Sequence, residues 1–147
     1  MRVDRALGIA VLAACLAVSA CGSSDPPRDT PEGTAVAITR TIIARDYDAF
    51  ERLMRNPNAA LLEEAGARPR PGSFAQVLVR EGKEQLRAAY DRAVAKNLGT
   101  GRLSVSTRPG PGGAVEVTVS DEAGRPLLGV LVKAFDGTYL GIDLRVY

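Results

Sequence analysis

The chain has no histidine and no tryptophan among its 147 residues, and only two cysteines. Histidine is the commonest general base and metal ligand in proteins, so its absence excludes a Ser-His-Asp triad and a Cys-His dyad. We expect Cys15 to be removed with an N-terminal signal, which leaves the mature chain without an internal disulfide. Its stability must then come from the burial of apolar side chains.

The chain also lacks a strong charge of either sign. Its 19 basic and 17 acidic residues give a formal net charge of +2, and the two signs are interspersed. This pattern gives no indication of a nucleic-acid partner or of electrostatic binding to lipid. The acidic pairs Glu63-Glu64 and Asp46/Asp48 fit helix caps and a solvated helix better than a metal site. We expect no metal and no cofactor.

The N-terminus, by contrast, has the order of a targeting signal. Arg2 and Arg5 precede an uncharged apolar run from Ala6 to Val18, which is shorter than the roughly 20 residues that span a bilayer. The run ends in an aliphatic residue, two small residues and a cysteine, Val18-Ser19-Ala20-Cys21. This pattern resembles the lipobox of bacterial lipoproteins. The resemblance implies cleavage after Ala20, a diacylglyceryl group on Cys21, and a protein held by lipid on the extracytoplasmic side of the cell membrane.

Three other interpretations of this segment are open. Leu12-Ala13-Ala14-Cys15 fits the same pattern, but it leaves too short an apolar run, and Cys21 has the more polar flank. The second interpretation is a buried helix over residues 6–20, with Cys21 as an ordinary thiol. It does not explain why the apolar run has a charged start and is followed by a polar break. Ordinary secretion would leave a lone exposed thiol in an oxidising compartment, which is unfavourable.

We therefore divide the chain into a signal peptide (1–20), a lipidated tether (21–30) and a domain (31–147). The segment from Gly22 to Asp29 is polar and contains Pro26-Pro27, so we expect an extended, disordered spacer.

Helical periodicity marks the first part of the domain. Thr30-Pro31-Glu32 is typical of a helix start, and Asp48 with Glu51 forms a second cap signal. Ser73 with Gln76 marks a third start, and Gly82 is a candidate break in the helix that follows. The pattern predicts helices over 32–45, 49–55 and 59–65, and from 74 to about 98.

After Gly101 the apolar period changes from about 3.6 to 2. Alternation predicts strands over 103–107, 115–120, 127–135 and 139–147, with Asp136-Gly137 as a two-residue hairpin turn. Helices followed by consecutive strands predict an α+β fold, in which N-terminal helices pack on one face of a four-stranded antiparallel meander sheet.

Two stretches resemble the nuclear-transport-factor-2-like, or cystatin-like (SnoaL-like), superfamily. They are the acidic join with its aromatic residues, Ala44-Arg45-Asp46-Tyr47-Asp48-Ala49-Phe50, and the final hairpin, from Val132 to Ile142. The resemblance implies a cone-like domain with a cavity between helices and sheet. Members include isomerases, cyclases, scaffold subunits and lipoproteins, so the fold does not decide the function.

Two groups of residues are candidate sites. Asp143 and Tyr139 are expected on one face of the last strand near Glu116, where a carboxylate base and a hydroxyl donor could act together. The alternative is a set of cross-strand charge pairs on a solvated face, formed by Glu116, Lys133, Asp143 and Arg145.

The second group is aromatic, and its members could line a pocket for an apolar ligand. They are Tyr47, Phe50, Phe74 and Tyr90. The alternative is ordinary core packing. The arginine-proline loop over 68–72 is a weaker candidate for contact with phosphate or a partner.

These observations favour a membrane-anchored, non-catalytic extracytoplasmic module that binds a ligand or a protein partner. The alternatives are a cavity enzyme of the isomerase or cyclase kind, which requires a buried Asp143, and a structural lipoprotein that acts only through partners.

Overall fold

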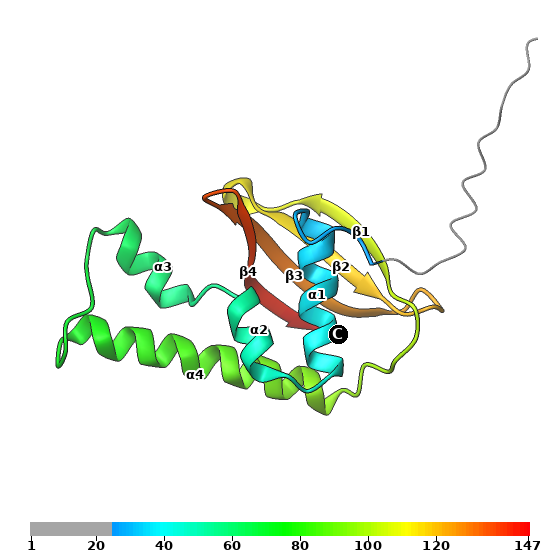
Figure 1. Cartoon of the computed structure of the whole chain (residues 1–147), viewed down its shortest axis with the longest axis horizontal. Helices are drawn as coiled ribbons and strands as arrows, with labels where there is room; N and C mark the ends of the chain where they lie inside the picture. Colours follow the sequence, from blue (N-terminus) through cyan, green and yellow to red (C-terminus); the bar gives the residue numbers. More distant parts are fainter. Residues whose placement is uncertain (1–24) are drawn as a thin grey trace, which may run out of the picture.

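A computed structural model describes residues 25–147, so the lipobox and Cys21 lie outside the described residues. The domain is α+β, with helices first and an antiparallel sheet after them (Figure 1). The helices are α1 (Pro31–Ile43), α2 (Tyr47–Leu53), α3 (Pro57–Glu64) and α4 (Phe74–Ala95). The strands are β1 (Ser104–Pro109), β2 (Val115–Ser120), β3 (Pro126–Phe135) and β4 (Thr138–Val146), with a short 3-10 helix η1 (Pro111–Gly113) between β1 and β2.

Side-chain caps explain where all four helices begin, and Ser73 caps α4 as predicted, by accepting from the N–H of Gln76 at 3.3 Å. The Thr30 hydroxyl accepts a bond from the N–H of Gly33 at 3.0 Å, as its sequence position predicts. The cap of α2 is Asp46, which accepts from the N–H of Ala49 at 3.0 Å, so the prediction of Asp48 as the cap was wrong by two residues. Asn56 caps α3, and Pro57 takes the first helical position, where it needs no N–H partner.

Helix α4 is continuous over 22 residues and is not broken at Gly82. Gly82 is buried because the side chain of Asn56 lies against it, and a Cβ atom there would overlap with Oδ1 of Asn56. The absence of a side chain at Gly82 therefore lets Asn56 approach α4 closely, and it does not bend the helix. At 1.5 Å per residue, α4 extends for about 33 Å.

The four strands form one meander sheet in the order β1-β2-β3-β4, with every neighbouring pair antiparallel. Asp136 and Gly137 both have positive φ, at 48° and 80°, which is the backbone of the tight hairpin turn that the sequence predicts. The expected fold class, with helices on one face of this meander, is confirmed.

The core lies between α1 and the sheet, with α2 and the C-terminal half of α4 closing its side (Figure 1). Ile38 of α1 and Phe50 of α2 are fully buried, as are Val117 of β2 and Val130 of β3. These side chains fill the space in which the family resemblance implies a cavity.

A bulge in β4 changes which side chains face the core. Leu131 pairs with Asp143 while the next residue of β3, Val132, pairs with Gly141, so Ile142 is an extra residue in β4. Because cross-strand partners share a face, Tyr139 lies on the core face and Asp143 on the outer face of the sheet. The sequence prediction that these two side chains share a face was therefore wrong.

The segment before α1 folds back instead of extending away. Asp25 forms an ion pair with Arg40 at 3.2 Å, and the Thr34 hydroxyl donates to the carbonyl of Arg28 at 3.3 Å. The carbonyl of Pro27 accepts from both the N–H and the hydroxyl of Thr30. The expectation of a free spacer does not hold for residues 25–29, which lie along α1.

Candidate functional site

Three of the four aromatic candidates form one cluster in the body of the domain. The ring centroid of Tyr90 lies 5.1 Å from those of both Tyr47 and Phe50, and the centroids of Tyr47 and Phe50 are 6.0 Å apart. Phe50 is fully buried and Tyr90 is 4% exposed, and burial raises the pKa of the Tyr47 and Tyr90 hydroxyls. These rings fill space with one another, as in ordinary core packing, rather than surround an open pocket.

The fourth aromatic candidate lies elsewhere. Phe74 is the first residue of α4 and is 75% exposed. Tyr90 comes sixteen positions after Phe74 in this continuous helix, which corresponds to a rise of about 24 Å. Phe74 therefore does not share a pocket with Tyr47, Phe50 and Tyr90.

The proposed carboxylate and hydroxyl pair is also separated. Asp143 is exposed on the outer face of β4, whereas Tyr139 packs against the core from the other face. The cavity-enzyme alternative required a buried Asp143 next to Tyr139. The bulge at Ile142 is the physical reason why neither condition is met.

Charge pairs occupy the outer face of the sheet instead. Arg108 of β1 donates two hydrogen bonds to Glu116 of β2, at 2.7 and 2.9 Å, and Arg145 of β4 lies 3.9 Å from the same carboxylate. This arrangement agrees with the cross-strand alternative for Glu116 and Arg145 and adds Arg108, which sequence analysis missed, but among the described residues Lys133 and Asp143 form no ion pair. Strand pairing, which sets Arg108 opposite Glu116, is the information that was lacking.

The feature that departs most from the body of the domain is a helical hairpin, which we name the arm: residues 57–81, comprising α3, the loop 65–73 and the start of α4. It projects beyond the sheet at the left of the molecule (Figure 1). No residue of α3 is buried. The arm is therefore a part of the fold with little core of its own.

Polar bonds hold the two helices of the arm together at its base. The side-chain amide of Asn56 donates to the carbonyl of Val79 at 2.8 Å, and that of Asn58 donates to the carbonyl of Leu78 at 2.7 Å. Oδ1 of Asn56 also accepts from the first N–H groups of α3. Two amide side chains thus fix the angle between α3 and α4.

Arg55 joins the base of the arm to the sheet. Its backbone N–H donates to the carbonyl of Gly141 at 2.7 Å, beside a parallel bridge between Met54 and Gly141. Its guanidinium lies 4.6 Å from the ring centre of Phe135 and forms an ion pair with Glu63 of α3. Sequence analysis gave no signal for this residue, because its partners are distant in the chain.

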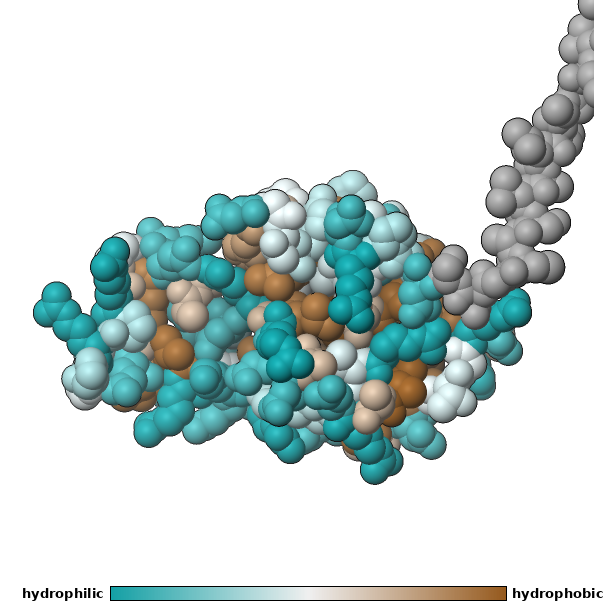
Figure 2. All heavy atoms as spheres, viewed as in Figure 1, coloured by the Kyte–Doolittle hydropathy of each residue, from teal (hydrophilic) through white to brown (hydrophobic). Residues whose placement is uncertain are grey.

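The arm exposes apolar side chains that a folded core would normally bury. Leu61 is 64% exposed, Phe74 is 75% exposed, and Val77 is also exposed. Figure 2 shows apolar surface on the arm between its polar rims. A hollow of about 490 Å³ opens there, lined by Leu62, Val79 and other residues of α3 and the loop. Both helices of the arm thus carry exposed apolar side chains, and a hollow opens between them, as in many interaction surfaces.

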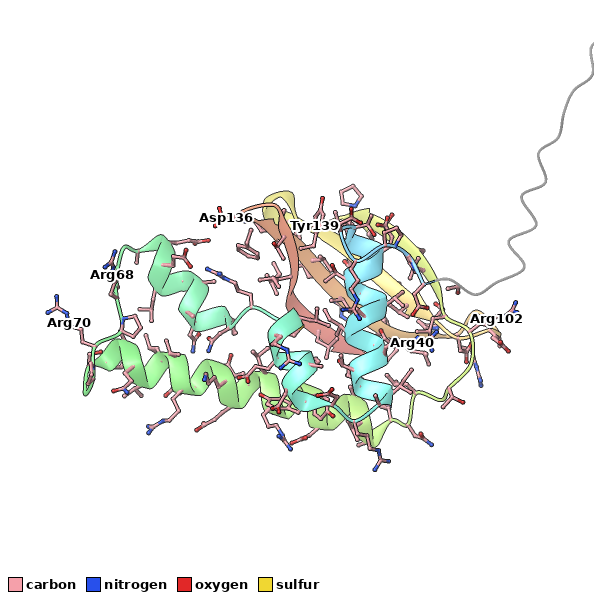
Figure 3. The ribbon with its side chains drawn as sticks, viewed as in Figure 1. Arg40, Arg68, Arg70, Arg102, Asp136 and Tyr139 are labelled. Carbon is pink, nitrogen blue, oxygen red and sulfur yellow. The ribbon has the colours of Figure 1, made fainter. Side chains whose placement is uncertain are left out.

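The end of the arm is basic. Arg68 and Arg70 point into solvent from the loop 65–73, at the end farthest from the sheet (Figure 3). The loop is closed by Ser73, whose hydroxyl bonds to Arg70, and by Gln76, which accepts from the N–H of Gly72 at 2.7 Å. The arginine-proline loop that the sequence singled out is thus an ordered tip.

Within residues 25–147, no cluster of three potential ligands could hold a metal ion, and no helix is long and apolar enough to cross a membrane. A second surface groove, of about 430 Å³, lies between the segment 25–28, α1 and α2, and is lined by charges of both signs. Comparison of the chain with protein-family models, with curated proteins and with solved structures finds no match.

Proposed function

We propose that this protein is a membrane-anchored, extracytoplasmic lipoprotein whose domain acts as a non-catalytic interaction module. The observation that carries the proposal is the lipobox-like Val18-Ser19-Ala20-Cys21 directly before a folded domain. Two or more acyl chains on Cys21 would give stable anchoring without a spanning helix.

The arrangement of side chains supports the non-catalytic part of the proposal. Asp143 and Tyr139 lie on opposite faces of the sheet, and the aromatic cluster around Phe50 is filled. Among the described residues, three of the four large hydrophobic side chains that are exposed lie on the arm, which offers a surface for another molecule. An interaction role suits such a surface better than a reaction does.

The intact mass of the membrane-extracted protein tests the anchor. We expect an acylated chain that begins at Cys21, and the loss of both the acyl mass and membrane retention in Cys21→Ala. Cys15→Ala is the matched control, because Cys15 ends the rival motif and its removal should leave the mass of the mature protein unchanged. An unmodified wild-type chain, or one that begins elsewhere, would contradict the proposal.

A further inference from the structure

The tip of the arm combines exposed apolar side chains with positive charge. Leu61, Phe74 and Val77 of the arm are exposed, and the loop 65–73 at its end contains Arg68 and Arg70 and no acidic residue. The acids of the arm lie in its helices, at Glu63, Glu64 and Glu81, and Glu63 is paired with Arg55. The arm as a whole carries three basic and three acidic residues, but the loop at its end carries positive charge alone.

We propose that the tip of the arm docks on an anionic phospholipid surface, with Phe74 in the interfacial region and Arg68 and Arg70 on lipid phosphates. Basic side chains beside exposed aromatic and aliphatic ones have the chemistry of an interfacial lipid contact. This inference rests on the proposed lipid anchor, which brings the domain to such a surface.

The folded start of the domain leaves only a short connection between its body and a lipid on Cys21. Asp25 is fixed to α1 by its ion pair with Arg40, only four residues after Cys21. Four residues reach at most about 14 Å. A lipid on Cys21 would therefore hold the body of the domain against the membrane instead of letting it extend far away.

The anchored segment and the tip lie at different ends of the molecule. Arg40, which holds Asp25, is on α1 over the sheet, while Arg68 and Arg70 mark the far end of the arm (Figure 3). Contact at both places lays the long axis of the domain along the membrane. The arm then acts as a second point of contact that sets the orientation of the domain.

A second copy of this chain fits the tip less well than lipid does. Pairing of two tips around a two-fold axis brings like surfaces together, so Arg68 and Arg70 of the two copies would approach one another. Anionic headgroups instead complement these charges. Local charge complementarity, together with an anchor that would hold the whole domain at a membrane, therefore favours lipid.

The absence of tryptophan allows a direct test. Phe74→Trp places a single tryptophan at the tip, and Tyr147→Trp places one at the end of the chain as a control, because Tyr147 is also well exposed. Each lipidated full-length protein is reconstituted in phosphatidylcholine vesicles with and without phosphatidylglycerol. Tryptophan emission and its quenching by brominated lipids are then measured, together with thermal unfolding to establish that the variants fold.

We expect blue-shifted, strongly quenched emission for Phe74→Trp with phosphatidylglycerol, and little change for Tyr147→Trp. Arg68→Gln and Arg70→Gln should each lower the inserted population about fivefold. High salt should also lower the inserted population, because it screens the attraction between the arginines and the lipid phosphates.

Three outcomes would overturn the inference. They are solvent-like emission of Phe74→Trp on anionic vesicles, equal quenching of the two tryptophans, and a shift that depends on protein density without lipid quenching, which would indicate pairing of arms. Failure of the anchor is separately visible as a protein without acyl mass, and the quenching experiment can still be performed on that protein.

Discussion

The body of the domain and the arm both contain α-helices, but they are stabilised in different ways. In the body, α1 and the sheet bury Ile38, Val117 and Val130 completely. In the arm, no residue of α3 is buried, and Asn56 and Asn58 hold the helices through side-chain amides. Burial in the body stabilises the fold as a whole. The exposed apolar surface of the arm therefore has little effect on the stability of the domain.

Two phenylalanines give the largest contrast between the regions. Phe50→Ala removes a fully buried ring and should lower the free energy of unfolding by about 3–5 kcal/mol. Phe74→Ala removes a ring that is 75% exposed and should change it by less than about 0.5 kcal/mol. Urea unfolding of both variants measures the difference. Equal losses would mean that the arm is part of the cooperative core.

The joint of the arm should show a smaller and local effect. Asn56→Ala removes the cap of α3 and the bond to the Val79 carbonyl, and caps contribute about 1 kcal/mol. Hydrogen exchange should therefore accelerate in α3 while the amides of β2 and β3 keep their protection.

Gly82→Ala sharpens the same test, because its Cβ atom would overlap with Asn56. Alone it should loosen the arm. In the Asn56→Ala background it should instead stabilise α4, by up to about 1 kcal/mol of helix propensity. Additive effects in this double-mutant cycle would contradict a direct contact between the two residues.

The sequence contains the information for elements more than for their contacts. The cap at Thr30, the turn at Asp136-Gly137 and the change of period after Gly101 depend on neighbouring residues, and the structure has them where local chemistry predicts. The α+β class follows from the order of these elements.

The candidate site was harder to predict because it depends on spacing across strands and between helices. A single extra residue at Ile142 moves Asp143 to the outer face, and no local signal announces the bulge. Phe74 shares its residue type with Phe50, yet its place at the start of α4 separates it from the core. The approach of Asn56 to Gly82 likewise joins residues that are distant in the chain.

High pH should weaken the body and leave the arm unaffected. Burial, the largest cause, raises the pKa of the Tyr90 hydroxyl above its ordinary value of 10.0. The unfolded chain then loses the proton first, so stability is full below pH 10.0 and declines as the pH rises toward the folded pKa. Tyr90→Phe should reduce this decline, as measured by urea unfolding on both sides of pH 10.0. If the free energy of unfolding of Tyr90→Phe declined with pH as steeply as that of the wild type, the decline would be due to other groups, such as Tyr47.

Low pH should have the smallest effect, confined to the turn between β2 and β3. The pKa of Asp121 is lowered from its ordinary value of 3.8, first by the backbone N–H of Arg125, which donates to Oδ1 at 2.9 Å. The N–H of Ala123 also donates to this oxygen, at 3.0 Å. The stabilisation is therefore present above pH 3.8 and is lost as the pH falls through the lower, folded value.

Asp121→Asn tests this turn. It should be slightly less stable than the wild type at neutral pH, and the two should converge in acid, because protonation removes the same charge from the wild type. Asp136→Asn is the control, since Asp136 lies in the other hairpin turn and asparagine tolerates its positive φ. The tip of the arm is closed by the neutral groups of Ser73 and Gln76, so hydrogen exchange there should not change in acid. If exchange in the tip accelerated together with exchange in the turn, the arm and the body would open as one unit. That result would contradict the conclusion that the two regions are stabilised separately.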